Sequence, residues 1–367
     1  MSHRLPIILR ARDAGWDVTA AAAADAVSHD AEALDVLREH GVEFVDLPIS
    51  RSGRNPRREV LAYRALLALY RRIRPTVVHH VTIKPVIYGS RAARTAHVPG
   101  VVNAVAGLGS LFLDDSLGGR MQRTLVLAMY RRALVHPNVV MLFQNDHDAQ
   151  AFDELRLGTS ARRAVVRGSG VDLSVFRATE EQLNERPLVV FPARLLRDKG
   201  IMEFVAAAEM LRNEGTPARF AIVGAEDPNP SSVSAALLRE WRERGTVELW
   251  GYRKDMPAVF AQCAIVCLPS YREGLPKALI EAAASGRAVV TTDVPGCRDA
   301  VSSQSALLVP ARDPVALADS LRTLIGVGGL RRRLGEAGRR LAERDFSVDA
   351  VADDTLAIYN QLLRTSV

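Results

Sequence analysis

The sequence predicts an α/β protein built from two parallel sheets, each in its own domain. Short apolar, β-branched runs bounded by Gly, Pro or Asp alternate with segments of helical length almost from end to end, as βαβ units require. The chain has 367 residues, of which 48% are hydrophobic and 25% are charged. This is ordinary globular composition, and the length is enough for two domains of about 150 residues each.

Strands are predicted at similar spacing in both halves. In the first half they lie at 17–22, 42–47, 76–81, 101–105, 139–144 and 164–166. In the second half they lie at 188–193, 219–223, 247–250, 264–268, 288–292 and 306–309, so two sheets of similar size are expected. The stretch from Gly168 to Pro187 predicts the crossing between domains. We therefore expect domains at 1–172 and 173–349, with a helix of about 350–367 packing back on the first.

The first residues do not fit a complete doubly wound domain. Such a domain opens with a strand and a Gly-containing turn. Here the chain runs directly into a predicted helix, with Ser2 as a cap and Pro6 in the first turns. The first strand of the N-terminal domain is thus predicted to be missing: either the chain begins downstream of the true start, or the domain lacks its central strand.

Composition excludes several classes of protein. No run of apolar residues reaches the roughly 18 that a membrane helix needs. Three cysteines (Cys263, Cys267 and Cys297) are too few for a disulfide framework, and no zinc-ligand spacing surrounds them. A reducing cytoplasm is the expected location.

The excess of positive charge lies in the N-terminal half. Residues 1–176 hold 23 Lys and Arg against 17 Asp and Glu, whereas residues 177–367 hold 25 of each. Arg51–Arg74 carries eight arginines and a single acid, Glu59, which predicts a basic face that attracts phosphates. The alternative is an ordinary solvated helix surface. Nucleic acid is not expected, because no stacking aromatics interleave the arginines.

A glycine-bearing turn follows the predicted strand 264–268. The segment from Ser270 to Gly286 places this turn before a helix that begins near Pro276, so free amides and a helix N-terminus point to the carboxyl edge of the sheet. Glu273 lies on the turn and Glu281 lies inside the helix. The two carboxylates can accept hydrogen bonds from different hydroxyls of one extended ligand.

A second turn carries two cations. The strand 188–193 is followed by Arg194 and Lys199, which flank a short turn before a helix near Ile201. Two cations at the mouth of the same sheet would neutralise a diphosphate leaving group. Pairing of these cations with surface acids is the alternative.

In this order and spacing, the two segments resemble the family-4 retaining glycosyltransferases of the GT-B fold, which have two Rossmann-like domains facing a cleft. The resemblance covers essentially the whole chain. It implies that Arg194 and Lys199 hold the diphosphate of a nucleotide sugar, that Glu273 holds the donor sugar and that Glu281 holds the ribose hydroxyls. Arg194, Lys199 and Glu273 are then the catalytic residues. The turn that assists Glu273 consists of Gly274, Leu275 and Pro276.

The N-terminal half resembles a bacterial branch of that family, through residues 78–89 and 103–109. The branch extends saccharides on undecaprenyl diphosphate for O-antigen, capsule or protein glycans. Lys84, just past a predicted strand, could meet an acceptor phosphate or hydroxyl, and an ordinary loop lysine is the alternative. His79 and His80 alternate across the strand, so only one can face the cleft. The acceptor-side candidates are His79, His80, Lys84 and Gly107.

No metal or other cofactor is expected. The acidic pair Asp146 and Asp148 fits a helix cap better than a metal-binding DxD motif. Residues 247–255 lie where the family's nucleobase loop falls, with Gly251 allowing close approach of the ligand. The branch implies that the nucleotide is UDP.

The sequence therefore predicts a retaining transferase that moves a hexose or N-acetylhexosamine from a UDP-sugar to a lipid-linked saccharide. It is expected on the inner face of the cytoplasmic membrane, attached peripherally to anionic lipid through Arg51–Arg74. Two alternatives remain at this point: a nucleotide-sugar epimerase of the same fold, and a truncated, non-catalytic binder of sugar nucleotides.

Overall fold

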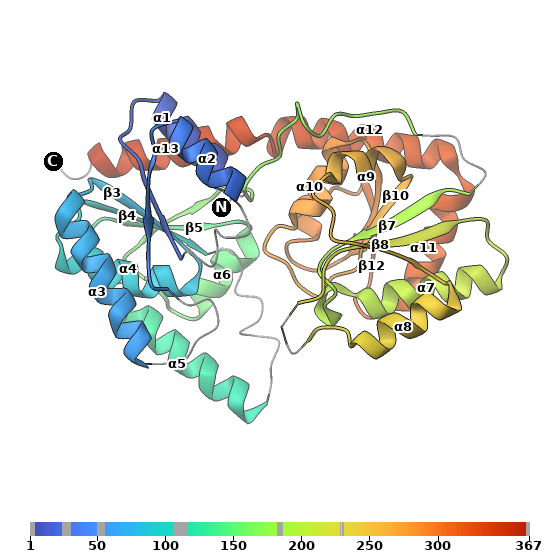
Figure 1. Ribbon diagram of the computed structural model, residues 1–367, viewed down its shortest axis with the longest axis horizontal. Coiled ribbons are helices and arrows are strands. Elements are labelled where there is room, and N and C mark those ends of the chain that lie inside the picture. Colours follow the sequence, from blue (N-terminus) through green and yellow to red (C-terminus); the bar gives the residue numbers. More distant parts are fainter. Residues whose placement is uncertain are drawn as a thin grey trace. The chain divides into compact units, whose positions relative to one another are not determined.

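The computed structural model describes residues 4–23, 31–49, 56–105, 116–181, 186–227, 229 and 231–364. The chain divides into two compact units, Met1–Ser169 with Val348–Val367, and Gly170–Ser347 (Figure 1). Each predicted strand is present, with bounds within two residues of those expected.

The first unit contains two parallel sheets rather than one. The larger has the order β3-β4-β5-β6, and the smaller pairs β1 only with β2. The strands are β1 (Thr19–Ala22), β2 (Glu43–Asp46), β3 (Val77–Val81), β4 (Gly100–Val105), β5 (Val139–Phe143) and β6 (Arg162–Val165). Two sheets of similar size, one in each half, had been expected, and this was wrong for the first half because no described strand pairs with both β1 and β3.

The helices of this unit pack on both faces of the four-stranded sheet and on the smaller sheet. They are α1 (Leu5–Asp13), α2 (Ala31–Glu39), α3 (Pro56–Ile73), α4 (Ile83–Thr95), α5 (Leu117–Ala133), α6 (Asp146–Glu154) and α13 (Val348–Arg364). The described chain opens with α1, which begins without a side-chain cap and has Pro6 in its first turn. The predicted cap, Ser2, lies outside the described residues.

Strand β4 shows how this unit is packed. All six of its residues are buried. Val101 belongs to one apolar cluster, whereas its neighbour Val102 belongs to another, on the opposite face of the sheet. The second cluster includes Leu362, so α13 from the end of the chain completes the core of the first unit (Figure 1).

The second unit is a single six-stranded parallel sheet with the order β12-β11-β10-β7-β8-β9. Its strands are β7 (Leu188–Pro192), β8 (Arg219–Val223), β9 (Glu248–Gly251), β10 (Ile265–Leu268), β11 (Ala288–Thr292) and β12 (Ala306–Val309). Its helices are η3 (Arg197–Lys199), α7 (Ile201–Asn213), α8 (Ala235–Arg244), α9 (Met256–Gln262), α10 (Lys277–Ala284), η4 (Arg298–Ala300), α11 (Pro314–Gly326) and α12 (Gly328–Asp345).

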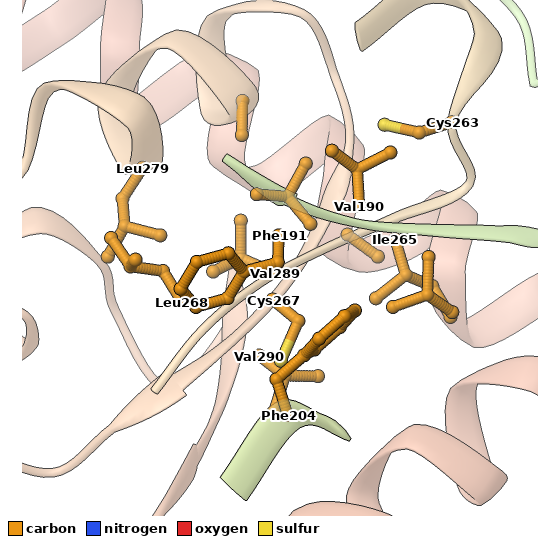
Figure 2. Close-up of a cluster of buried hydrophobic side chains, with 14 of the residues drawn as sticks. Val190, Phe191, Phe204, Cys263, Ile265, Cys267, Leu268, Leu279, Val289 and Val290 are labelled. Carbon is orange, nitrogen blue, oxygen red and sulfur yellow. The ribbon is translucent and has the colours of Figure 1, made fainter. Parts of the chain in front are cut away.

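The central strands and α7 form one part of the core of the second unit. Figure 2 shows Phe191 of β7 among side chains of β10 and β11, and its ring centroid lies 5.3 Å from that of Phe204 on α7. The three cysteines are free and buried. Burial raises the pKa of the Cys263 thiol to about 12, so this residue acts as a small apolar side chain.

Because the strands of the second sheet are parallel, a binding site can form at the edge where they all end. All strands of the second sheet point the same way, so the segments that follow β7, β8, β10 and β11 leave the sheet at the same edge. The two turns singled out in the sequence follow β7 and β10, which pair directly.

Candidate active site

The centre of the site is an ion pair between the two turns. Nζ of Lys199, the last residue of η3, donates to Oε1 of Glu273 at 2.6 Å. The hydroxyl of Ser270 donates to the same oxygen at 2.8 Å. The side chains of Lys199 and Glu273 are 17% and 13% exposed, so the pair is largely shielded from water. The predicted diphosphate cation and the predicted sugar-binding carboxylate are therefore brought together.

Two glycines allow this approach. Gly200 has a φ of +75°, and a Cβ on it would lie 2.0 Å from the carbonyl oxygen of Pro269. A Cβ on Gly296, which follows β11 and has a φ of +80°, would lie 2.3 Å from the carbonyl oxygen of Glu273. Both positions require glycine because any side chain would clash with backbone and strain the left-handed conformation. Tight backbone packing on two sides thus fixes the turn that carries Glu273.

Arg194 is more open than Lys199. Its guanidinium donates to Oδ2 of Asp227 at 2.7 Å, and its side chain is 60% exposed. Asp227 lies in the segment that follows β8. Arg194 is thus placed at the same edge of the sheet, in contact with an acid that the sequence had not singled out.

Glu281 lies on α10 and is 8% exposed. Burial raises the pKa of its carboxyl group, and Lys277, whose Nζ lies 3.3 Å away, partly opposes that shift. The side chains of Leu275 and Pro276 are buried. The apolar side chains of the predicted donor turn therefore pack inward, and Glu281 is buried on the helix that follows it.

A cavity of about 290 Å³ lies beside this edge of the sheet. Gly251 borders it at the end of β9, with a φ of +68° and open space where a Cβ would point. Trp250, Tyr252 and Arg242 also line the cavity. It has aromatic surface, a cation and a glycine, which suit a planar, polar ring.

The histidines predicted on the acceptor side are both packed inside the first unit. Nδ1 of His79 lies 2.6 Å from the hydroxyl of Tyr359 on α13. His80 is 4% exposed and lies between the hydroxyl of Tyr70 and the side-chain oxygen of Asn103, each 2.8 Å away. Burial lowers the pKa of His80 to about 4, so its ring is neutral at physiological pH. The two rings point to opposite faces of β3, as expected from their alternation, and each has a hydrogen-bond partner within the first unit.

The other acceptor-side candidates lie apart. Lys84, in the first turn of α4, donates to Oε1 of Glu59 on α3 at 2.6 Å. Gly107 lies outside the described residues.

The acidic pair Asp146 and Asp148 lies in the first turn of α6. The cap of this helix is Asn145, whose side-chain oxygen accepts from the amide of Asp148 at 2.7 Å. The helix cap therefore lies one residue before the acidic pair to which it had been assigned.

Sequence reasoning missed Asp227, Ser270 and Tyr271, all of which follow strands at the carboxyl edge of the second sheet. Their position after β8 and β10 was the available signal.

Among the described residues, no helix has both the length and the apolarity to cross a membrane. Within the same part of the chain, no three His, Cys, Asp or Glu side chains gather as they would around a metal ion.

Two Rossmann-type units, with a lysine and two glutamates at the carboxyl edge of the second sheet, define a glycosyltransferase of the GT-B class. Comparison with known proteins supports this class on both halves of the chain. Residues 186–326 match the family model described as glycosyl transferases group 1, and residues 2–141 match the model described as glycosyl transferase 4-like. Each half of the chain thus resembles a glycosyltransferase family, and the whole chain is a glycosyltransferase of the GT-B type.

The curated relatives include bacterial glycosyltransferases. One is the N,N'-diacetylbacillosaminyl-diphospho-undecaprenol alpha-1,3-N-acetylgalactosaminyltransferase of Campylobacter jejuni, 26% identical over 98% of this chain and 95% of the relative. Another is a capsular polysaccharide biosynthesis glycosyltransferase of Staphylococcus aureus, 25% identical over 50% of this chain and 48% of the relative.

Solved structures share the fold. Sucrose-phosphate synthase from Thermosynechococcus elongatus aligns with a TM-score of 0.78 at 18% identity, covering 98% of this chain and 92% of that one. The Anabaena protein HepE in complex with UDP-glucose aligns with a TM-score of 0.73 at 16% identity, covering 99% and 95%. These likenesses show the GT-B fold.

Proposed function

We propose that this glycosyltransferase moves a hexose or N-acetylhexosamine from a UDP-sugar to a saccharide carried on undecaprenyl diphosphate, with retention of anomeric configuration. The observation that carries the proposal is the shielded pair of Lys199 and Glu273 at the carboxyl edge of a parallel sheet. The Campylobacter relative, named for an undecaprenol-linked acceptor, supports the class of acceptor.

The two cations suit a departing diphosphate. A lysine ammonium has three donors, so Lys199 can keep Glu273 and still donate to a phosphate oxygen. Arg194 is exposed enough to turn from Asp227 toward a ligand. As the bond between the anomeric carbon and the diphosphate breaks, its electron pair passes to the phosphate oxygen, where these cations stabilise the new charge. No metal or other cofactor is part of this proposal.

Glu273 and Glu281 are assigned to the rest of the donor. Glu273 accepts from a hydroxyl of the sugar and fixes its orientation, and Glu281 accepts from the ribose hydroxyls. The cavity beside Gly251 takes the uracil. The acceptor hydroxyl attacks the anomeric carbon from the face that the diphosphate leaves, and its proton passes to the departing phosphate oxygen. No covalent enzyme intermediate is proposed.

Attachment to anionic lipid is part of the proposal. From Arg57 to Arg74, every exposed residue is an arginine or is apolar. The acid in this stretch, Glu59, is turned to Lys84 at 2.6 Å. Val60 and Leu61 are 52% and 54% exposed among the arginines of α3. Arg72 pairs with Glu43 of β2 at 3.1 Å. The other exposed side chains of this stretch are arginine or apolar, which suits anionic headgroups above a hydrocarbon layer.

Helix α5 adds exposed apolar surface to the same unit. Met121 and Leu125, one turn apart on α5, are 73% and 62% exposed. Both α3 and α5 pack on α4. These observations support a peripheral position of the first unit on the membrane, where a lipid-linked acceptor would lie.

The decisive experiment offers the protein a panel of UDP-sugars with an undecaprenyl-diphosphate-linked saccharide. We expect transfer of one sugar into the lipid fraction, with an α-linkage from an α-linked donor by NMR. An inverted linkage would contradict retention. Release of an epimerised nucleotide sugar without acceptor would instead establish the epimerase alternative, and donor binding without any product would establish a binder.

A further inference from the structure

Tyr271, the second residue of the donor turn, is attached to the segment that carries Lys199 at two points. Its backbone amide donates to the carbonyl oxygen of Asp198 at 2.9 Å. Its hydroxyl donates to Oε1 of Glu203 at 2.7 Å. Asp198 lies in η3 directly before Lys199, and Glu203 lies in the first turn of α7 just after it. One residue thus holds both sides of the lysine's own segment.

A third element fixes the ring of Tyr271. The guanidinium carbon of Arg312 lies 4.6 Å from the ring centroid, a cation–π contact. Arg312 comes from the connection between β12 and α11, with a φ of +63° that is uncommon for a residue other than glycine. The ring is therefore held by the segments that follow β7 and β12 as well as by its own turn.

The hydrogen bond to Glu203 persists at physiological pH. Burial raises the pKa of the Tyr271 phenol, and the nearby Glu203 raises it further. The hydroxyl thus keeps its proton and remains a donor. Oε2 of Glu203 is buried and has no hydrogen-bond partner among the described residues, so loss of the phenol would leave this carboxylate still less satisfied.

We propose that Tyr271 is a positioning residue, which ties the donor turn to α7 and thereby holds Glu273 in register with Lys199. The inference rests on the proposed function, since Glu273 is assigned there to the donor sugar. Glu273 lies two residues beyond Tyr271. Its carboxylate is also held by Lys199 and Ser270, and its turn is approached by backbone at Gly200 and Gly296. Removal of the Tyr271 hydroxyl would loosen the position of the Glu273 carboxylate. The side chains of Arg194 and Lys199 would themselves be unchanged.

The test compares Tyr271→Phe with Glu203→Gln and Glu203→Ala. Tyr271→Phe keeps the ring under Arg312 and removes only the donor. Misplacement of a reacting group by about 1 Å costs on the order of 10²-fold in rate, so we expect kcat to fall by about 10- to 100-fold. The dissociation constant for UDP should stay within about twofold, because the diphosphate cations are unchanged.

Glu203→Gln retains an oxygen that accepts from the phenol and should restore most of the rate, whereas Glu203→Ala should match Tyr271→Phe. The double variant Tyr271→Phe with Glu203→Ala should be no slower than either single variant, because both remove the same bond. Tyr63→Phe is the matched control, since it removes a tyrosine hydroxyl that contacts Thr95 at 3.3 Å in the first unit.

Hydrogen exchange separates this inference from the proposed function. In the presence of UDP, Tyr271→Phe should speed amide exchange across residues 270–276 and leave peptides of α12 unchanged. That result supports the tether even if no UDP-sugar is transferred by the wild-type protein, an outcome that would overturn only the function. Unchanged exchange in this segment, a wild-type kcat, or equal losses in UDP affinity and kcat would overturn the positioning role.

Discussion

Nζ of Lys199 lies 2.6 Å from Oε1 of Glu273, although the two residues are 74 positions apart in the chain. Both side chains are largely buried, so each charge is stabilised mainly by its partner rather than by water. Removing one partner of a shielded pair leaves an uncompensated charge, which costs more than loss of the contact itself. The pair is thus the point at which the donor site and the stability of the second unit are coupled.

Glu273→Ala should reduce turnover by about 10²-fold or more, because it removes the group assigned to orient the donor sugar. It should also destabilise the protein by about 3 kcal/mol, since Lys199 is left without its partner. Urea unfolding should show that the double variant Lys199→Ala with Glu273→Ala loses less stability than the two single changes added together. Strict additivity would contradict the coupling.

Glu240→Ala is the control for this change. Glu240 is an exposed acid on α8 that pairs with Arg244 at 2.6 Å. Exposed pairs of this kind contribute about 0–1 kcal/mol, so activity and stability should stay close to those of the wild type.

Arg194→Ala should weaken UDP binding while leaving the fold almost unchanged. The arginine is exposed, so its pair with Asp227 contributes little to stability. A charged hydrogen bond to the diphosphate is worth about 1.5–3 kcal/mol, which corresponds to at least a tenfold loss of affinity. Titration calorimetry with UDP and a melting curve would measure the two effects. Unaltered affinity would remove Arg194 from the donor site.

Glu281→Gln should become relatively more stable as pH rises. Burial raises the pKa of Glu281 in the folded protein above its ordinary value, so the folded state binds this proton more tightly than the unfolded state. Stability is then lost as pH rises through the folded pKa, a loss that glutamine cannot undergo. Urea unfolding at about pH 5 and about pH 7.5 should show a growing advantage for the variant. A difference that is constant with pH would contradict this sign.

Gly224→Ala should destabilise the second unit. A Cβ at this position would lie 1.8 Å from the carbonyl oxygen of Ala193, so the segments after β7 and β8 would have to separate. Overpacking of this kind costs about 1–3 kcal/mol. Gly326→Ala is the matched control, because nothing lies within 4 Å of its Cβ position. Equal melting temperatures for the two variants would refute the proposed close approach.

Charge reversal on α3 should abolish vesicle binding. Arg58→Glu with Arg64→Glu alters two exposed arginines, each worth about 1 kcal/mol near an anionic surface. Cosedimentation with phosphatidylglycerol vesicles should fall steeply, while UDP binding is kept. Arg332→Glu with Arg333→Glu changes the net charge equally on the second unit and should bind vesicles as the wild type does. Equal binding of the wild type to neutral vesicles would argue against the surface.

Sequence patterns were sufficient for the local elements of the fold. Apolar runs that are buried on both faces, such as Val139–Phe143, identify strands without reference to their neighbours. The pairing of strands was predicted less well. In the first half β1 and β2 form a sheet apart from β3, although the list of strands suggested one sheet, because pairing depends on which edges meet in space.

For the candidate site, too, the residues were predicted better than their contacts. Arg194, Lys199, Glu273 and Glu281 were identified from residue type and spacing, and the structure places all four at or near one edge of the second sheet. The partners Asp227 and Tyr271 were not identified, since their contacts cross from one strand end to another. The contact of His79 with Tyr359 also depended on a helix far away in the sequence.

By itself, the sequence determined the α/β class, the strand positions and the residues with chemistry suited to a diphosphate and to the hydroxyl groups of a ligand. These follow from periodicity and residue type, which act over a few positions along the chain. Only the tertiary structure decided that Lys199 contacts Glu273, that Tyr271 joins the donor turn to α7 and that α13 completes the core of the first unit. Such contacts arise where parallel strands end at a common edge, or where distant helices find the same apolar face, and neither is encoded locally.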